Sequence, residues 1–312
     1  VAIRIASGLI SLSETGGVPG FIARNYVGVE KAHYQCGSED QTFPWFYGLY
    51  HFYKSDIPDH ALRTSCNAAL TRVAQALHAH SYRIPCSTAE FGYKGDFSSG
   101  EINNAAKLLF LQLMMYDLTG ERIWRKRYFD ALTEVPPGKT ISRFDLLKQG
   151  VNYPKYDGIS VFYCIPTGEG AADVFSENVK ITTFPFFTMV MASIAMDDIV
   201  KLEHDLRIRE PIKDALRRDC ALCQTHISRG KRYSLSNAPV FSDNWRVMNQ
   251  IWTKQKNSRE AFELAWRQMP VWFEECPCFP YENALVREPL FAAYASLLSD
   301  NEVDEAYIEK VC

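Results

Sequence analysis

The chain has 312 residues, of which 47% are hydrophobic and 13% aromatic, so it has enough apolar surface for a large core. Its formal net charge of −3 excludes the strongly basic proteins that bind nucleic acids or anionic membranes. No window of about 18 apolar residues occurs, and we therefore expect no membrane-spanning helix. We expect a single domain over residues 1–312, and Val1 in place of an initiator Met leads us to expect an upstream segment.

The first elements are a helix over residues 1–14 and a polar, glycine-rich connection over residues 15–41. The connection carries Arg24, Tyr26 and His33 and is too long to be a simple turn. Long ordered connections in compact domains are often functional, so these three side chains are candidates for substrate binding.

The run Ser-Glu-Asp-Gln at residues 38–41 opens a strongly aromatic helix over residues 43–53. Ser38 or Asp40 can cap the free N–H groups there, and Pro44 is tolerated in a first helical turn. The helix is apolar on every side, which predicts a buried position. We interpret its central rings as core residues, and the histidine as a core residue with a hydrogen-bond partner: Trp45, Phe46, Tyr47, Tyr50 and His51.

A second helix over residues 58–80 and a wide loop over residues 81–99 follow. Residues 100–133 then form the clearest unit, because an entirely apolar helix stops at Leu118-Thr119-Gly120-Glu121 and an amphipathic helix follows. The amphipathic helix has an apolar side with Trp124, Tyr128, Phe129 and Leu132, and a water-facing side with Arg122, Arg125, Lys126 and Asp130.

After an irregular region over residues 134–179, with a short strand predicted at 161–165, the order of an apolar helix and an amphipathic helix returns. The further pairs are 184–196 with 209–227, 243–254 with 258–269, and 283–298 with 301–311. Such a repeat indicates a stacked array, either a solenoid or a closed ring. The ring fits better, because the inner helices have no polar concave face and residues 1–14 supply half of a sixth hairpin. We expect an all-α (α/α)6 toroid with long loops at one end.

Nine cysteines are scattered along the chain, and Cys220-x-x-Cys223 with Cys276-x-Cys278 has a spacing seen in zinc sites. The first pair, however, continues a helical stripe formed by Ile208, Ile212 and Leu216. A free cysteine in such a stripe behaves as a small hydrophobic residue, which favours a packed core. We expect no metal and no cofactor.

The Ser-x-Asp-Gln run before an aromatic inner helix, and the Thr-Gly-Glu stop between an apolar and an amphipathic helix, resemble the six-hairpin glycosidase superfamily. The organisation is similar to that of bacterial enzymes acting on polysaccharide fragments, including unsaturated glucuronyl and rhamnogalacturonyl hydrolases, with no single family assigned. The resemblance implies that the loops before the inner helices form a sugar-binding cleft. It favours a periplasmic or extracellular location, whereas unpaired cysteines fit a cytoplasmic one.

Each inner-helix entrance carries an acid and an amide. Glycoside hydrolysis needs one protonated carboxyl group and a second carboxylate that activates water or attacks carbon. The candidate catalytic acids are Asp40, Asp243, Glu39, Glu101 and Glu177. The candidate substrate-binding residues are Arg24, Tyr26, His33, Gln41, Asn104, Asn178, Lys180, Asn244, Trp245, Glu282 and Arg287.

Acids and amides at helix starts are also what N-capping requires, so each entrance alone is explained by a cap. Asp40 stands out because Glu39 adjoins it and an aromatic segment follows, and neighbouring acids in partly apolar surroundings can have a raised pKa. Asp243 ranks second, with Trp245 as a stacking platform.

The leading function is a glycoside hydrolase acting on a carbohydrate, with a uronic acid that Arg24, Lys180 or Arg287 pairs. One alternative is a polysaccharide lyase using Tyr153, Tyr156 and His33 for β-elimination. Another is a non-catalytic carbohydrate-binding toroid. The sequence has no acid run of the terpenoid-cyclase type, no Gly-rich phosphate loop and no Ser/His/Asp order.

Overall fold

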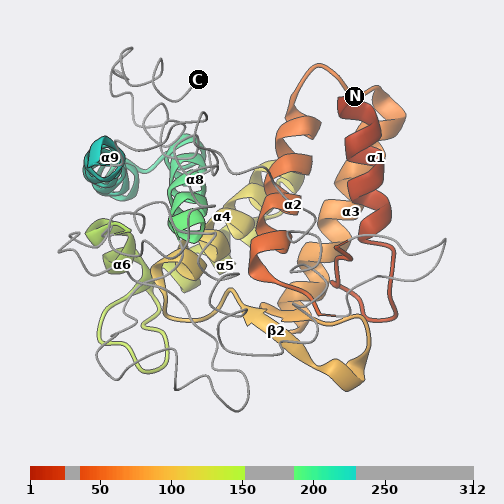
Figure 1. Cartoon of the computed structure of the whole chain (residues 1–312), viewed down its shortest axis with the longest axis horizontal. Coiled ribbons are helices and arrows are strands. Elements are labelled where there is room, and N and C mark those ends of the chain that lie inside the picture. Colours follow the sequence, from red (N-terminus) through yellow and green to blue (C-terminus); the bar gives the residue numbers. More distant parts are fainter. Residues whose placement is uncertain (25–35, 152–185, 230–312) are drawn as a thin grey trace, which may run out of the picture. The chain divides into compact units, whose positions relative to one another are not determined.

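The computed structural model describes residues 1–24, 36–151 and 186–229 (Figure 1). Of the described chain, 67% is helical and 4% is strand, which confirms the predicted all-α class. The chain divides into two compact units, and the first comprises Val1–Gly150 and Ala195–Lys213. The hairpins predicted beyond residue 230 and the strand predicted at 161–165 lie outside the described residues.

The first three helices of this unit are α1 (Ala2–Leu12), α2 (Glu39–Lys54) and α3 (His60–Ala79), as predicted from their apolar spacing. Each of the three packs against the other two. The indole N–H of Trp45 donates to the Leu9 carbonyl at 2.7 Å, which ties α2 to α1. At the start of α3, Asp59 Oδ1 accepts the Leu62 N–H at 2.8 Å and caps the helix.

Only one face of α2 is fully buried, so the prediction of a helix buried on every side is wrong. Trp45, Phe46 and Tyr50 are core residues as expected, whereas Tyr47 is only partly buried. His51 has a polar partner but is not a core residue: its side chain is 41% exposed, and Nε2 lies 2.6 Å from a carboxylate oxygen of the buried Asp198. Tyr47 and His51 are four residues apart, so they share the less covered face of the helix.

Helix α4 (Ile102–Thr119) is buried without interruption from Asn103 to Met115, which confirms the predicted inner helix. It ends at Gly120, whose φ of +68° is in the left-handed region that favours glycine. The outer helix α5 (Arg122–Thr133) then returns along α4, and the two pack together. The Thr-Gly-Glu stop therefore marks the tight turn that the sequence predicted.

Two predictions for α5 need correction. Trp124, Tyr128 and Leu132 are buried as expected, but Phe129 is 38% exposed. Arg125, expected in water, is 22% exposed and binds the fully buried Glu203 at 2.6 Å. The Arg125 guanidinium also covers the Phe129 ring, 4.4 Å from its centroid. The arginine predicted to face water is thus largely covered, and the phenylalanine predicted to be buried is partly exposed.

The loop predicted over residues 81–99 contains a small antiparallel sheet, which the sequence did not predict. Strand β1 (Arg83–Pro85) pairs with β2 (Tyr93–Asp96), and the 3-10 turn η1 (Ala89–Phe91) connects them. Strands of three and four residues are too short to show an alternating apolar pattern. The sheet contacts α3 through β1 and α2 through β2, so it lies against the start of the aromatic helix.

The region predicted as irregular over residues 134–179 contains a helix, α6 (Arg143–Gln149), which packs against α4 and α5. Further along the chain, α8 (Phe186–Leu202) and α9 (Leu206–Arg229) confirm the predicted pair and extend it. Ile208, Ile212 and Leu216 of the proposed apolar stripe are buried. The side chains of the neighbouring cysteines lie outside the described residues.

Helices α2 and α4 run parallel, because the contacts between them follow the same order along both helices. Glu39 lies near Lys107, the Phe43 and Phe110 rings are 5.7 Å apart, and the Tyr50 hydroxyl donates to Asp117 at 2.7 Å. The starts of both helices therefore meet at one end. The contact between His51 and Asp198 places the C-terminal end of α8 beside that of α2.

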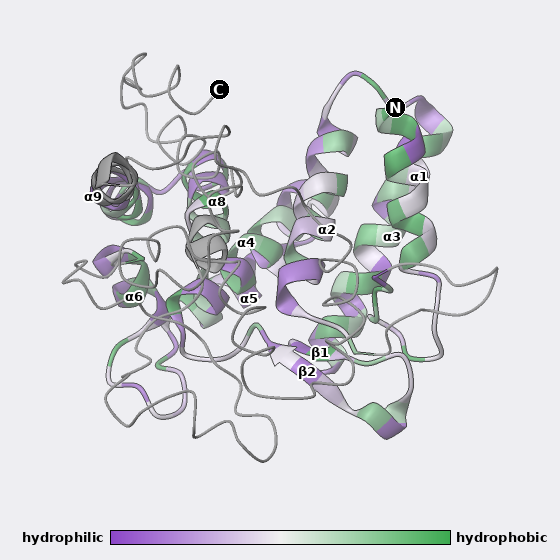
Figure 2. Ribbon diagram, viewed as in Figure 1, coloured by the Kyte–Doolittle hydropathy of each residue, from purple (hydrophilic) through white to green (hydrophobic). Residues whose placement is uncertain are grey.

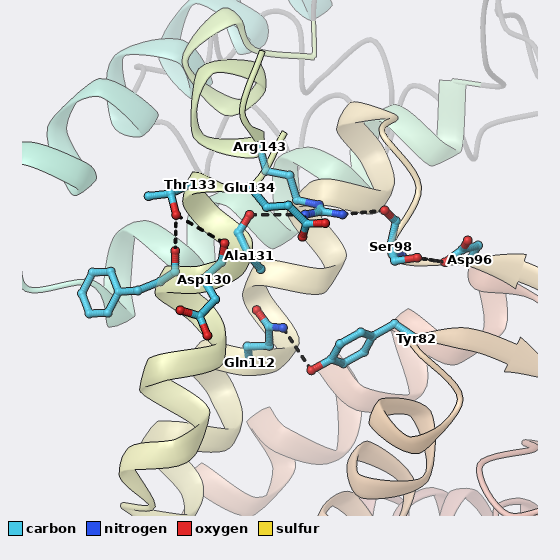
Figure 3. Close-up of polar contacts among 10 residues, drawn as sticks. Tyr82, Asp96, Ser98, Gln112, Asp130, Ala131, Thr133, Glu134 and Arg143 are labelled. Atoms are coloured by element: carbon cyan, nitrogen blue, oxygen red, sulfur yellow. Dashed lines mark hydrogen bonds and ion pairs between the residues drawn. The ribbon is translucent and has the colours of Figure 1, made fainter. Parts of the chain in front are cut away.

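Arg143 anchors α6, and we expect its removal to destabilise the first unit (Figure 3). The side chain is 1% exposed and donates to Ser98 O at 2.6 Å, Glu134 Oε2 at 2.5 Å and Ala131 O at 3.4 Å. Arg143→Met removes a buried donor and leaves the buried Ala131 carbonyl and the partly buried Ser98 carbonyl without their partner, so the free energy of unfolding should fall by about 2–3 kcal/mol. Denaturant unfolding measures this change.

Lys148→Met in the same helix is the matched control. Lys148 pairs with Asp145 where both side chains are about 40% exposed, so its loss should change the free energy of unfolding by less than about 1 kcal/mol. Equal effects of the two substitutions would contradict the anchoring role of Arg143.

Candidate functional site

Glu39, at the start of α2, is held on both carboxylate oxygens. Oε1 accepts the Asp96 N–H of β2 at 2.7 Å, and Oε2 lies 4.0 Å from Lys107 Nζ of α4. Gly95 makes this approach feasible, because a Cβ there would lie 2.8 Å from Glu39 Cγ and its φ of +108° favours glycine. Figure 2 shows the hydrophilic first turn of α2 beside the small sheet. The geometry fixes Glu39 between a backbone donor and a cation.

Lys107 is the unusual member of this group. Its side chain is fully buried, and Nζ makes no hydrogen bond to any described residue. Burial lowers the pKa of Lys107, while the negative charges of Glu39 and Asp40 raise it, with burial the larger effect. Lysines are almost never fully buried unless they are paired, and among the described residues this ammonium group has its ion pair with Glu39.

Asp40 completes what we call the acid–lysine cluster, namely Glu39, Asp40 and Lys107. The Asp40 side chain reaches the surface, yet the surrounding protein displaces enough water to raise its pKa above its ordinary value of 3.8. The charges of Lys107 and Arg24 oppose that rise. Burial likewise raises the pKa of Glu39, against the charge of Lys107 and the hydrogen bond from Asp96, and Asp40 raises it further. Both acids therefore bind protons more tightly than free carboxyl groups.

Three of the predicted binding residues lie in or beside this cluster. Arg24 is exposed and close enough for its charge to act on Asp40. The Asn104 side chain lowers the pKa of Glu39, which places it near that carboxylate, and it donates to Ser99 Oγ at 2.8 Å. Gln41 has a buried Oε1 with no hydrogen-bond partner among the described residues. The fold therefore places predicted acids, amides and a cation at or near the entrance of α2.

Hydrogen bonds from Asp96 and Arg143 hold the segment that follows β2. Asp96 Oδ1 accepts both the backbone N–H of Ser98, at 2.7 Å, and its hydroxyl, at 2.6 Å. The Ser98 carbonyl in turn accepts from the buried Arg143, as Figure 3 shows. The backbone N–H that holds Glu39 thus belongs to a segment that α6 anchors to the core.

Glu101 lies at the entrance of α4, as the sequence predicted. It is the residue before α4 and makes no capping bond, and its half-exposed carboxylate pairs with Lys139 at 3.0 Å. Asp40 does not occupy the capping position either, because α2 begins at Glu39 and its N-cap is Ser38, whose side chain makes no capping bond. The cap interpretation of Asp40 and the capping role of Ser38 are therefore both wrong.

The other predicted site residues lie outside the described residues. They are Tyr26, His33, Tyr153, Tyr156, Glu177, Asn178, Lys180, Asp243, Asn244, Trp245, Glu282 and Arg287.

Sequence reasoning missed Lys107, although a signal was present. It is the only charged residue between Asn103 and Met115, in a helix whose apolar residues predicted burial on all sides. It also follows Asn104 by three positions, which places both on one face of α4. A charge in the middle of a fully buried helix is itself an indication of a functional or paired group.

No protein-family model, curated protein or solved structure matches the chain. Over residues 1–24, 36–151 and 186–229, none of the helices combines the length and apolarity needed to cross a membrane. In the same part of the chain, no group of three or more His, Cys, Asp or Glu side chains is arranged to hold a metal ion. The functional argument therefore depends on the acid–lysine cluster.

Proposed function

We propose that this protein is a glycoside hydrolase that cleaves an oligosaccharide or polysaccharide fragment, with Asp40 as a catalytic carboxyl group. One observation carries the proposal: two adjacent acids with raised pKa values lie at a helix entrance beside a buried lysine that has no hydrogen-bond partner among the described residues. A raised pKa keeps a carboxyl group protonated at higher pH, as a general acid requires.

The geometry divides the roles within the cluster. Both oxygens of Glu39 are engaged, whereas Asp40 is exposed, so Asp40 is the acid that reaches a substrate. Lys107 is fully buried and acts as a positioning residue through the two carboxylates. Asp243 is proposed as the second catalytic carboxylate, with Glu101 and Glu177 as alternatives. A separation of about 5–5.5 Å between the two acids would give retention, and about 6.5–9.5 Å inversion.

We further propose the (α/α)6 toroid as the fold that carries this site. Support comes from the parallel course of α2 and α4, the burial of α4 along its length, and the meeting of their N-terminal ends at the acid–lysine cluster. Arg24 lies beside Asp40, and a guanidinium binds carboxylates well, which favours a uronic acid in the substrate.

A substrate panel tests the proposal. Neutral and uronate-containing oligosaccharides are incubated with the protein, and both new reducing ends and ultraviolet absorbance of an unsaturated uronate are measured. A hydrolase releases reducing ends without new absorbance. New absorbance would support the lyase instead, and saturable binding without any product would support a non-catalytic carbohydrate-binding protein.

The pH dependence of kcat/KM for the substrate that the protein cleaves gives a further prediction. If Asp40 is the general acid, activity falls as pH rises through its raised pKa, because the carboxyl group loses its proton. The charge of Lys107 lowers that pKa, so Lys107→Met should move the alkaline limb of the kcat/KM profile to higher pH. Lys139→Met, which removes an exposed lysine paired with Glu101, is the control and should leave the limb in place. A shift to lower pH in Lys107→Met would contradict the assigned charge effect.

A further inference from the structure

Two cysteines lie together beside the entrance of α2. Cys36 is partly exposed, Cys86 is fully buried, and both are free thiols. The two side chains lie close enough for Cys36 to raise the pKa of the Cys86 thiol, although 50 positions separate them in the sequence. Burial is the larger cause of that rise, and the nearby Gly37 N–H opposes it. Cys86 is thus a neutral thiol with a second thiol as its neighbour.

The backbone around the pair confirms the close approach independently. A Cβ added to Gly37, the residue after Cys36, would lie 2.5 Å from the carbonyl oxygen of Pro85, the residue before Cys86. Only glycine therefore permits the two segments to come so close. The Cys86 N–H donates to Gly92 O at 2.9 Å, which holds Cys86 in the hairpin of β1 and β2. Backbone segments in contact are what disulfide geometry requires.

We propose that Cys36 and Cys86 form a reversible disulfide by exchange with a small-molecule disulfide such as oxidised glutathione. Cys36, the more accessible thiol, loses its proton and attacks one sulphur of the small disulfide, forming a mixed disulfide and releasing one thiol. Cys86 then loses its proton and attacks Cys36 Sγ, which forms the intramolecular bond and releases the second thiol. The two protein thiols are oxidised by two electrons, and the small disulfide is reduced by two.

The bond would join two elements of the candidate site. Cys36 lies three residues before Glu39, and Cys86 belongs to the hairpin whose Asp96 N–H holds Glu39. Oxidation therefore links the segment before α2 covalently to the β1–β2 hairpin, whose Asp96 N–H donates to Glu39. It also closes a long loop in the unfolded chain, which stabilises the folded state.

Peptide mapping tests the proposal on the full chain. The protein is equilibrated with oxidised and reduced glutathione in several ratios, free thiols are blocked with iodoacetamide, and the chain is digested with trypsin. The two cysteines fall in separate peptides, 32–54 and 84–94. We expect these peptides to appear joined and lighter by two hydrogen atoms than their sum, and to separate again after reduction. Cys66, buried in α3, falls in peptide 64–72 and should be unmodified by glutathione.

Cysteine variants and measurements of Tm give a second test of the disulfide. Cys86→Ser should abolish the joined peptide and leave Cys36 with bound glutathione, while Cys66→Ala should leave the joined peptide unchanged. Oxidation should raise Tm by about 5 °C or more in the wild-type chain and not in Cys86→Ser. Recovery of both peptides fully alkylated, both separately carrying glutathione, or Cys36 joined to another cysteine would overturn the proposal. These readings need no substrate, so they are independent of the glycosidase proposal.

Discussion

Asp40→Asn should lower kcat/KM for the hydrolysed substrate by about 10²–10⁴-fold, the range typical for loss of a general acid or base. The amide keeps the shape of the side chain but neither donates a proton nor carries negative charge. Stability should not suffer. Because the folded state binds the Asp40 proton more tightly than the unfolded state, ionisation at neutral pH disfavours folding, and the substitution removes that cost. Tm should therefore hold or rise slightly.

Asp59→Asn is the matched control for this substitution. Asp59 is exposed and caps α3 through the Leu62 N–H, a bond that asparagine reproduces. Both variants should fold, and only Asp40→Asn should lose activity. Unchanged activity in folded Asp40→Asn would remove Asp40 from the catalytic mechanism. A large loss of Tm with normal activity in the folded fraction would assign Asp40 a purely structural role.

Glu39→Gln should destabilise the protein, and Lys107→Met should partly restore it. The first change deprives a fully buried ammonium group of its nearest carboxylate, and it also removes a carboxylate whose ionisation burial disfavours, so we expect a net cost of about 1–2 kcal/mol. The double variant removes the buried cation as well, and methionine fills the space with apolar atoms. It should therefore exceed Glu39→Gln in free energy of unfolding by about 1 kcal/mol or more, a coupling that denaturant titration resolves.

The exposed pair of Glu101 and Lys139 provides the comparison. Its atoms lie closer, at 3.0 Å, but both side chains are 35% or more exposed, so a double-mutant cycle should give a coupling of only about 0–1 kcal/mol. If the two cycles give equal couplings, burial of Lys107 does not control the energy of the cluster. The comparison separates the effect of solvent from the effect of distance.

The helices were predictable because their signals are local. The apolar run of α4 and the Thr-Gly-Glu stop at Gly120 required neighbouring residues only, and the structure confirms both. The sheet of β1 and β2 and the short helix α6 were not predicted, since three, four or seven residues do not establish a period. The predicted environment of Arg125 was also wrong, because its partner Glu203 is 78 positions away in the sequence.

The candidate site was predictable in part for the same reason. Glu39 and Asp40 are adjacent in sequence, and Asp40 raises the pKa of Glu39 as that adjacency predicts, whereas burial raises the pKa of Asp40 itself. The contacts of Glu39 with Asp96 and Lys107 join three separate elements, and no sequence period encodes them. Asn104 was expected at the entrance of α4, but its effect on the pKa of Glu39 depends on the parallel arrangement of the two helices.

The parallel course of α2 and α4 also determines the electric field at the cluster. Aligned peptide dipoles give a helix about half a positive charge at its N-terminal end and about half a negative charge at its C-terminal end. Both positive ends meet at Glu39 and Asp40, where they favour the negative charge of the two carboxylates. At the opposite ends, Lys54 lies beside Asp117 and Lys201 beside Asp198, which places cations at the negative poles. The shared direction of α2 and α4 thus places the two acids at the positive ends of the helix dipoles and the cations at the negative ends.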